Sequence, residues 1–378
     1  MKKSLVSLGE LIAPAALRRA GEAADLPILS MTMNSGLVDQ ADKFKKRVAS
    51  ADTSAYKRVL RGQLVVGFPI DEGVLSFQNI YDEAIVSPAY NVWNVRDPDL
   101  VCRDYLERFL RSPSSLAFYR TKLRGTTARR RTLSDDVFLS HAVPLPSIAE
   151  QERILAILNK TDSLCCNRNK AIQLANNFLR AIFLDMYGDP VTNPKRWPVF
   201  PMGDVIDFKG GSQPPKETFS DDARPGYVRL VQIRDFKTDK YKTYIPENLA
   251  KRAFEEDDIM IARYGPPVFQ ILRGLSGSYN VALMKAQPKK NILKEMIFWL
   301  LQLPAYHDVV VANSERTAGQ SGVNLELLNN LPVPLPPLSV QEEIAAKTTR
   351  ISKVIELQKT MLAELERKSK ALQAKFFS

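Results

Sequence analysis

The sequence contains few of the residues from which catalytic and metal sites are commonly built. Only two histidines, His141 and His307, and three cysteines, Cys102, Cys165 and Cys166, occur in 378 residues. A histidine-rich metal site is therefore excluded, and without a Cys-x-x-Cys pair neither structural zinc nor a disulfide framework is expected. Such sparse cysteine use fits a reducing, cytoplasmic compartment.

Long apolar segments are also missing. The longest apolar run, residues 296–301, is far shorter than the roughly 20 residues that a membrane-spanning helix needs. Ser7, Gly9 and Glu10 interrupt the apolar segment near the N-terminus, so we predict no signal peptide and no membrane association. Met1 lies close to the first globular block, and we expect no helical extension before it.

Motifs of nucleotide-dependent enzymes are absent as well. No phosphate-binding G-x-x-x-x-G-K-[ST] loop occurs. The nearest match to an Asn/Asp-Pro-Pro-aromatic methyltransferase motif, at residues 264–269, lacks the leading amide or carboxylate, and we interpret it as a loop. We therefore predict no catalytic residues, with an enzyme of unrecognised motifs as one alternative.

Basic residues exceed acidic ones along the chain. Lys and Arg number 53 against 42 Asp and Glu, a formal net charge of +11. This excess favours a polyanionic partner, either nucleic acid or an anionic membrane surface. The length predicts two or three domains.

A tandem repeat organises the sequence. Residues 143–154 read VPLPSIAEQERI and residues 333–344 read VPLPPLSVQEEI, at an offset of 190 residues. Because this offset is about half of the chain, we interpret the sequence as two copies of one unit.

Each copy of the motif leads into a long helix without internal Pro or Gly. We expect the first helix to begin at an N-cap Ser147 with Glu150 completing a capping box, and to end near Tyr187. In the second copy Ser339 precedes Glu342 in the same way, and the helix continues to the C-terminus. About 36 helical residues correspond to about 54 Å.

Both helices carry heptad repeats, which predict a coiled coil. The apolar seam positions are Ile154, Leu158, Ile172, Leu179 and Ile182 in the first helix, and Ile344, Ile351, Ile355, Leu362, Leu365 and Leu372 in the second. Further apolar residues widen the first stripe, at Leu155, Leu164, Ala171, Phe178 and Phe183. The pattern favours two helices side by side as a shared spine; an ordinary helical hairpin inside a core is the alternative.

The remaining blocks predict an α+β fold with two globular mixed domains. The domains are expected at 1–142 and 189–332, with spine helices at 143–188 and 333–378. Strands are expected at 63–68, 74–77, 84–86, 227–233, 258–262 and 280–284, and short helices at 100–110 and 293–303.

Clusters of basic and small polar residues predict DNA contacts in both blocks, because guanidinium groups and hydroxyls bind phosphates and guanine edges. In the first block they are Arg18, Arg19, Lys43, Lys45, Lys46, Arg47, Arg124, Thr126, Thr127, Arg129, Arg130 and Arg131. In the second they are Lys209, Gly210, Gly211, Ser212 and Gln213, which we expect to form a flexible loop, and Arg229, Gln232, Arg234, Lys237, Arg263 and Tyr264. One such cluster is commonly only solvated surface, whereas several together favour nucleic-acid binding.

The repeated V-P-L-P-x-[IL]-x-x-Q-E-x-I motif, followed each time by a heptad helix, resembles the specificity subunit of type I restriction–modification systems. The helix ends at residues 179–183 and 372–377 resemble that family too, as do residues 208–212 and 226–229 at the head of the second block. The resemblance covers essentially the whole chain.

This resemblance implies a subunit that recognises double-stranded DNA and has no catalysis of its own. Each globular block would be a target recognition domain for one half of a bipartite site, and the helices would pack antiparallel and set the spacer. Two modification subunits would supply methylation with S-adenosylmethionine, and restriction subunits would supply cleavage with ATP and Mg²⁺, so this chain would bind no cofactor. A standalone DNA-binding regulator with a coiled-coil spine is the alternative.

Overall fold

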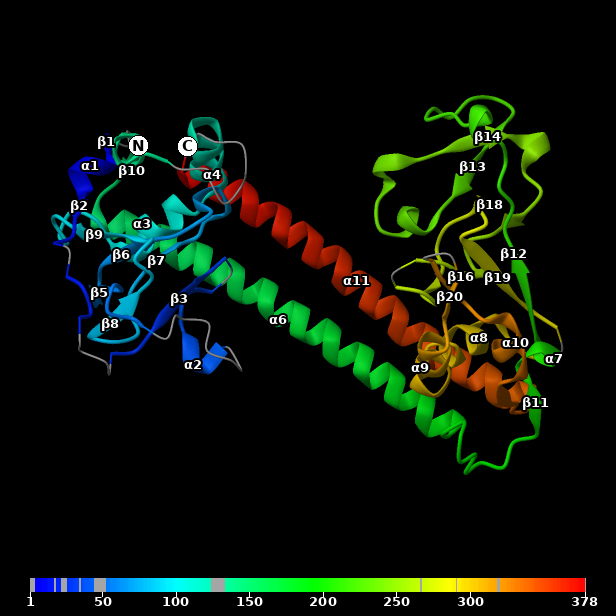
Figure 1. The fold of residues 1–378 in the computed structure, drawn as a ribbon. Coiled ribbons are helices and arrows are strands. Elements are labelled where there is room, and N and C mark those ends of the chain that lie inside the picture. The colour runs from blue at the N-terminus through cyan, green and yellow to red at the C-terminus, as the bar shows by residue number, and fades with distance from the viewer. Residues whose placement is uncertain are drawn as a thin grey trace. The chain divides into compact units, whose positions relative to one another are not determined.

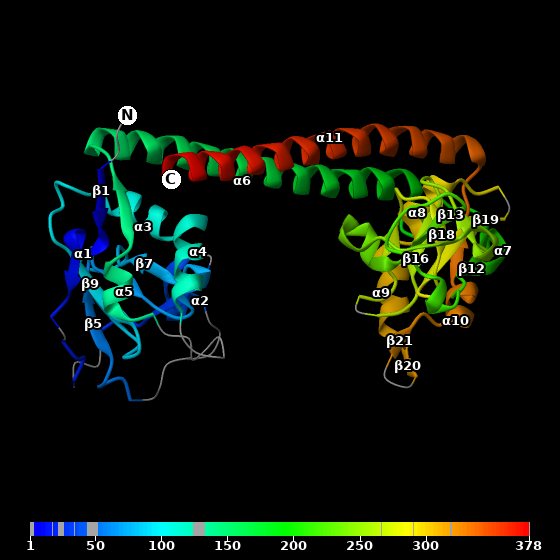
Figure 2. The same ribbon diagram turned by 90° about the horizontal axis from the view of Figure 1, so that it is seen from above.

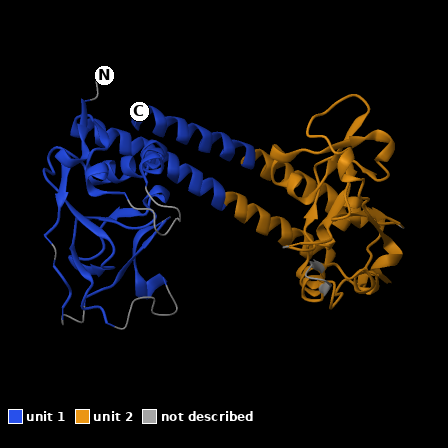
Figure 3. Cartoon of the chain, turned by 45° about the horizontal axis from the view of Figure 1, so that its top comes forward, with its two compact units in different colours: residues 1–170, 359–378 blue, residues 171–358 orange. Residues whose placement is uncertain are grey.

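The structure is a computed structural model that divides into two compact units. Unit 1 comprises residues 1–170 and 359–378, and unit 2 comprises residues 171–358 (Figure 3). The structure describes residues 4–377 except 17, 22–25, 34, 44–51, 124–132, 266, 290, 318 and 319, and the side chains of 315–317, 320 and 321. In this described part, no helix is both long enough and apolar enough to cross a membrane.

Two helices of 40 residues each dominate the secondary structure, α6 (Ile148–Tyr187) and α11 (Leu338–Phe377) (Figure 1). The predicted end of the first helix at Tyr187 is confirmed. Its start is also close to the prediction, because the Ser147 carbonyl accepts the amides of Glu150 and Gln151. The predicted N-cap at Ser339 is wrong, since α11 already begins at Leu338.

Pro337 flanks the start of α11 instead. Its carbonyl accepts the amides of Val340 and Gln341, as that of Ser147 does at the start of α6. Pro337 lies 190 residues after Ser147, so the repeat keeps its register although the capping residue type changes.

The predicted heptad seam is confirmed on both helices. Every predicted apolar seam residue is buried or half-buried. Between 159 and 171 of α6, the positions that are not exposed are Thr161, Cys165 and Arg168, which continue the same heptad seam. The alternative of a hairpin enclosed in a core is therefore wrong.

The helices pair antiparallel within each unit. In unit 1, Ile154 and Leu158 near the start of α6 share one apolar core with Phe377 at the end of α11. In unit 2, the Tyr187 hydroxyl at the end of α6 donates to the Pro334 carbonyl just before α11, at 2.7 Å. The polar seam residue Arg168 follows the same arrangement, with its Nη1 3.6 Å from Met361 Sδ in unit 1.

Unit 1 combines four sheets with short helices. Its four-stranded sheet has the order β2 (Ile12–Pro14), β9 (Asn91–Val95), β6 (Leu64–Val66), β7 (Leu75–Phe77). Two-stranded sheets pair β1 (Ser4–Ser7) with β10 (Ala142–Leu145), β3 (Leu29–Thr32) with β4 (Gly36–Asp39), and β5 (Lys57–Leu60) with β8 (Glu83–Val86). The short helices are α1 (Leu8–Leu11), α2 (Gln40–Lys43), α3 (Arg103–Leu110), α4 (Pro113–Lys122) and α5 (Asp135–Leu139).

Unit 2 repeats the four-stranded sheet in the order β12 (Ile206–Gly210), β19 (Leu283–Pro288), β16 (Ile259–Ala262), β17 (Ile271–Leu272). A second sheet has the order β14 (Tyr244–Pro246), β13 (Tyr227–Val231), β18 (Gly277–Tyr279), β15 (Ala253–Phe254). Two two-stranded sheets pair β11 (Val199–Pro201) with β22 (Pro332–Pro334) and β20 (Glu315–Thr317) with β21 (Gln320–Gly322). The short helices of unit 2 are α7 (Met202–Val205), α8 (Lys294–Leu300), α9 (Pro304–Ala312) and α10 (Leu325–Asn330). The repeat thus extends into the globular blocks, and the predicted α+β fold class is confirmed.

Each of the six predicted strands overlaps an observed one, and the largest difference in a strand's start has a local cause. The strand predicted at 280–284 begins later, at Leu283, because the Leu283 amide closes a turn onto the Asn280 carbonyl. The predicted short helices correspond to α3 and α8.

The repeated glutamine of the sequence motif ties each short helix to the spine. Gln151 is fully buried; its Oε1 accepts the Cys102 amide at 2.8 Å, and its Nε2 donates to the carbonyls of Leu100 and Pro146. Cys102 is the N-cap of α3, so this side chain fixes where α3 begins.

Gln341 forms the same three bonds in unit 2. It accepts the amide of Leu293, the N-cap of α8, at 2.9 Å and donates to the carbonyls of Asn291 and Pro336. The glutamine is therefore a structural element of the repeat, which positions a globular domain on each spine helix.

His141 is buried in unit 1, and we expect its titration to reduce stability in mild acid. Its ring stacks on Phe118 at 4.2 Å, and burial lowers its pKa to about 4. The unfolded imidazole protonates near pH 6.5, so stability is lost as pH falls from about 6.5 to about 4, by about 3 kcal/mol. Urea unfolding across this range should show the loss in wild type and in His307→Phe, but not in His141→Phe; equal profiles in all three would contradict it.

Candidate DNA interface

Each unit has one sheet edge at which three strand ends meet, which we call the strand-end edge. In unit 1, Pro14 at the end of β2 pairs with Trp93 of β9, and Val66 at the end of β6 pairs with Asn91. In unit 2, Gly210 at the end of β12 pairs with Met284, and Ala262 at the end of β16 pairs with Leu283. Residues that follow these strands are therefore collected at one edge, as loops on a rigid scaffold.

In unit 2, this edge brings together two of the predicted clusters. The Gly211 amide donates to the Leu283 carbonyl at 3.0 Å, and the Arg263 amide donates to the Ala282 carbonyl at 2.8 Å. Residues 209–213 and 263–264 thus lie on either side of the start of β19.

The loop after β12 is held closely against its neighbours. Lys209 and Gly210 still belong to β12, and an added Cβ at Gly211 would lie only 2.0 Å from the Asn280 carbonyl oxygen. The Ser212 amide donates to the Tyr279 carbonyl at 3.1 Å. The expectation of a flexible loop is wrong for this part of it, because only glycine permits this close approach.

Some polar side chains at the unit 2 strand-end edge have an ion-pair or hydrogen-bond partner within the protein, and others do not. The Lys209 ammonium pairs with Asp207 at 3.3 Å. Among the described residues, the buried Nε of Arg263 and the buried Oγ of Ser212 have no hydrogen-bond partner. The Arg263 guanidinium lies over the Tyr264 ring, 5.0 Å from its centroid.

The other predicted residues of unit 2 lie on β13 and the turn that follows it. Arg229 pairs with Asp239 at 3.0 Å, and Arg234 donates to the Tyr241 carbonyl at 3.4 Å. Gln232 caps the short 3₁₀ helix at Ile233–Phe236, and Lys237 is exposed. Carboxylate pairing gives Arg229 a structural role, and its DNA contact stays a prediction.

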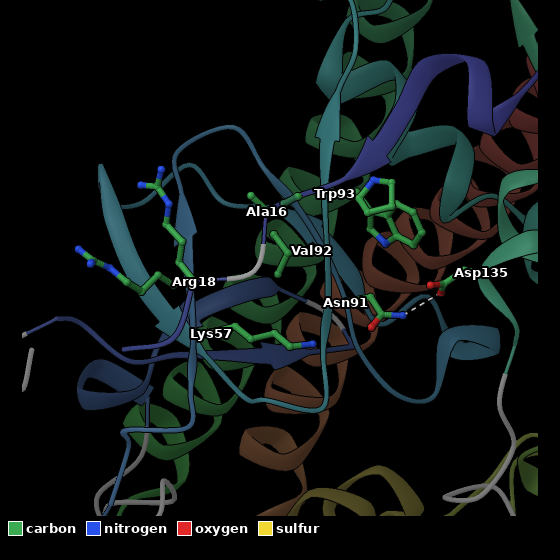
Figure 4. Close-up of a pocket in the computed structure, with 10 residues that line it drawn as sticks. Ala16, Arg18, Lys57, Asn91, Val92, Trp93 and Asp135 are labelled. Atoms are coloured by element: carbon green, nitrogen blue, oxygen red, sulfur yellow. Dashed lines mark hydrogen bonds between the residues drawn. The ribbon is translucent and has the colours of Figure 1, made fainter. Parts of the chain in front are cut away.

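In unit 1, the strand-end edge opens into a small pocket of about 150 Å³ (Figure 4). Its lining residues are Pro14, Ala15, Ala16, Arg18, Lys57, Arg58, Asn91, Val92, Trp93 and Asp135. Asn91 donates to Asp135 at 3.1 Å. Lys57 donates to the Tyr90 carbonyl at 2.6 Å, and burial lowers the pKa of this lysine. The pocket therefore combines cationic, amide and carboxylate groups, which can bind phosphates and base edges.

Of the predicted residues in unit 1, Arg18 and Arg19 lie at or beside this pocket. Both are exposed; the Arg18 carbonyl accepts the Arg58 amide at 2.8 Å, and Arg19 forms a β-bridge with Lys57. Lys43 is exposed at the end of α2. Lys45, Lys46, Arg47, Arg124, Thr126, Thr127, Arg129, Arg130 and Arg131 lie outside the described residues.

Sequence reasoning missed four polar residues of the unit 1 pocket, Lys57, Arg58, Asn91 and Asp135. They come from three separate segments, so no single local cluster marks them. One signal was present in the sequence. Asn91 is the first residue of β9, and Asn280 lies three residues before β19, the repeat-equivalent strand. Within the part of the chain that the structure describes, no group of three or more His, Cys, Asp or Glu could hold a metal ion.

The sequence is similar to type I restriction enzyme specificity subunits over part of its length. Residues 194–367 match the family model described as type I restriction modification DNA specificity domain. The MjaVIII type I restriction enzyme specificity subunit of Methanocaldococcus jannaschii is 20% identical over 297 residues, 68% of this chain and 67% of that protein. A putative type I restriction enzyme MjaX specificity subunit of the same organism is 23% identical over 251 residues, 61% of this chain and 57% of that protein.

Solved structures share the fold over the full length. A chain from a structural study of complex assembly and conformational transition of the type I R-M system has a TM-score of 0.61 at 18% identity, covering 99% of this chain and 98% of that one. The type I restriction-modification S subunit from M. genitalium has a TM-score of 0.59 at 13% identity, covering 100% and 96%. The doubled motif, the paired spine helices and the two equivalent sheet edges thus accompany a sequence that is similar to the type I restriction modification DNA specificity domain over residues 194–367 and a fold that is shared with these solved structures over nearly the whole chain.

Proposed function

We propose that each unit reads one half of a bipartite DNA site, and that the pair of helices α6 and α11 sets the number of unread base pairs between the halves. The observation that carries this proposal is the strand-end edge, which occurs once in each unit at equivalent strands. Each edge presents polar and basic groups from several loops, as base and phosphate contacts require. The family matches favour this subunit role over a standalone DNA-binding regulator.

We assign the chemistry to partner subunits. Modification subunits, two of them for two half-sites, would bind S-adenosylmethionine, and restriction subunits would bind ATP and Mg²⁺, while this chain would hold none of these. Such a complex would meet cellular DNA in the cytoplasm.

The spine helices support partner binding. Of the residues predicted to widen the apolar stripe, Leu155 and Phe183 are buried, whereas Leu164 and Phe178 are exposed. In unit 2, Leu174 and Phe178 of α6 and Val354 and Leu357 of α11 are each more than half exposed. Exposed apolar residues on neighbouring helices are typical of a protein interface, and the modification subunit is the partner we assign to it.

Lengthening the spine should lengthen the spacer. We expect one extra heptad in both helices, inserted after Arg168 in α6 and before Met361 in α11, to add about 10.5 Å and hence about three base pairs at 3.4 Å each. The insertion points face each other in unit 1, so the seam stays in register. Long-read mapping of methylated sites in cells that also express the modification subunit measures the spacer.

The control carries the same seven residues after Asp221, in an exposed loop of unit 2, and should leave the spacer unchanged. A wild-type spacer in the double-insertion protein, with both half-sites still methylated, would refute the role of the helices as a ruler.

A further inference from the structure

We propose that Arg263 binds a forked hydrogen-bond acceptor on the DNA, a guanine edge or a phosphate, and thereby anchors the half-site that unit 2 reads. This inference rests on the proposed function and assigns one residue of unit 2 to it.

Arg263 differs from the neighbouring arginines in lacking a described carboxylate partner. Arg229 pairs with Asp239 at 3.0 Å and Arg273 pairs with Glu295 at 2.6 Å. No described carboxylate pairs with Arg263, and its Nε is buried without an acceptor. Because a buried donor without an acceptor is unfavourable, an acceptor supplied by a ligand would stabilise this arrangement.

The backbone of Arg263 is fixed on both sides. Its amide donates to the Ala282 carbonyl at 2.8 Å, and its own carbonyl accepts the Val323 amide at 3.0 Å. The residue directly follows β16, whose four residues are all buried. Arg263 therefore starts from a rigid position at the strand-end edge.

The guanidinium itself lies between the Tyr264 ring and Gly210. Its Cζ lies 5.0 Å from the Tyr264 ring centroid, and its Nη1 would lie 3.6 Å from a Cβ placed on Gly210. The Tyr264 ring in turn lies against Gly322, where an added Cβ would be 3.0 Å from Tyr264 Cε1. Orienting the side chain before binding reduces the entropy lost when it binds.

The chemistry of this arrangement suits DNA. A guanidinium presents a planar fork of donors that matches guanine O6 and N7, or two phosphate oxygens. Ser212 adds a hydroxyl whose Oγ is also buried without a described partner, on the loop across the start of β19. Lys209 is already paired with Asp207, which leaves Arg263 as the uncompensated cation in this pair of loops among the described side chains.

Selection from randomised duplex DNA tests the assignment. The full chain, assembled with its modification subunit, is compared as wild type, Arg263→Ala and Arg263→Lys. The matched control is Arg224→Ala, which removes an exposed arginine that also stacks on a tyrosine, Tyr227 at 5.0 Å, in the same unit. We expect Arg263→Ala to weaken binding about 10-fold to 100-fold, the range for losing one good bidentate contact, and the control to match wild type.

The pattern of loss identifies the acceptor. A guanine contact predicts that Arg263→Ala and Arg263→Lys both lose the base preference at one position of one half-site. A phosphate contact predicts weaker binding to all sequences by Arg263→Ala, a log–log salt dependence shallower by about one, and partial rescue by lysine. Thermal melting checks that each variant is folded, and the lysine variant serves if the alanine variant is not.

Unchanged affinity and an unchanged selected sequence for folded Arg263→Ala or Arg263→Lys would overturn the assignment while the proposed function stands. If wild type itself selected no bipartite sequence, the proposed function and this assignment would both be overturned. Gly322→Ala tests whether the position of the guanidinium matters. The added methyl group should displace the Tyr264 ring but keep the charge of Arg263, so we expect it to weaken DNA binding less than Arg263→Ala does.

Discussion

Replacing Gln151 with leucine should lower the free energy of unfolding of unit 1 by about 4 kcal/mol. The side chain is fully buried, and leucine would leave the Cys102 amide and the carbonyls of Leu100 and Pro146 without their partner. Each buried main-chain group left unpaired costs about 1–3 kcal/mol, and the apolar leucine recovers part of the sum. Urea denaturation followed by circular dichroism measures the difference.

The second copy of the motif provides an internal replicate. Gln341→Leu should destabilise unit 2 by a similar amount, because Gln341 makes the same three bonds. Gln173→Leu, on the exposed surface of α6, should change stability by no more than about 0.5 kcal/mol. If Gln151→Leu were as stable as Gln173→Leu, the glutamine would not be what fixes the short helices to the spine.

The spine could be predicted from sequence because a heptad period is a local signal that survives along 40 residues of each helix. The alternation of Ile154, Leu158 and their successors specifies the buried stripe without knowledge of any partner. The start of α11 was predicted wrongly because serine is a common N-cap, although the repeat register pairs Pro337, and not Ser339, with Ser147.

The shared order of the four-stranded sheets was not accessible from the sequence. Strand pairing is made by main-chain groups, so Trp93 and Leu283 can occupy the repeat-equivalent strands β9 and β19 without resembling each other. Recognition blocks can therefore diverge in sequence while the sheet that supports them is kept.

The candidate site was predictable only where its residues are neighbours in sequence. The stretch from Lys209 to Gln213 is visible as a cluster, but its meeting with Arg263 depends on the position of β19 between β12 and β16. Composition likewise cannot show that Arg229 is paired with Asp239 whereas Arg263 has no described carboxylate partner. These distinctions depend on distances, which a list of basic residues does not contain.

Truncating Phe377 to alanine should destabilise unit 1 by about 4 kcal/mol, although this residue is the last but one of the chain. Its side chain is 4% exposed and packs edge-on against Tyr105 at 5.7 Å and Phe109 at 5.8 Å, both on α3. Burial of a phenylalanine in such a cluster is worth about 3–5 kcal/mol, including the cavity that alanine leaves.

Phe178→Ala is the matched control, since the same side chain on α6 is 60% exposed and its loss should cost little. Thermal and urea unfolding, with a probe confined to unit 1 such as Trp93 fluorescence in a protein lacking the other tryptophans, measures the effect. Equal stability of the two variants would contradict the packing of α11 onto the first recognition domain. Loss of stability in Phe377→Ala but not in Phe178→Ala would mean that α11, the last helix of the second copy, stabilises the globular domain of the first copy. The two copies would then be linked through both α6 and α11.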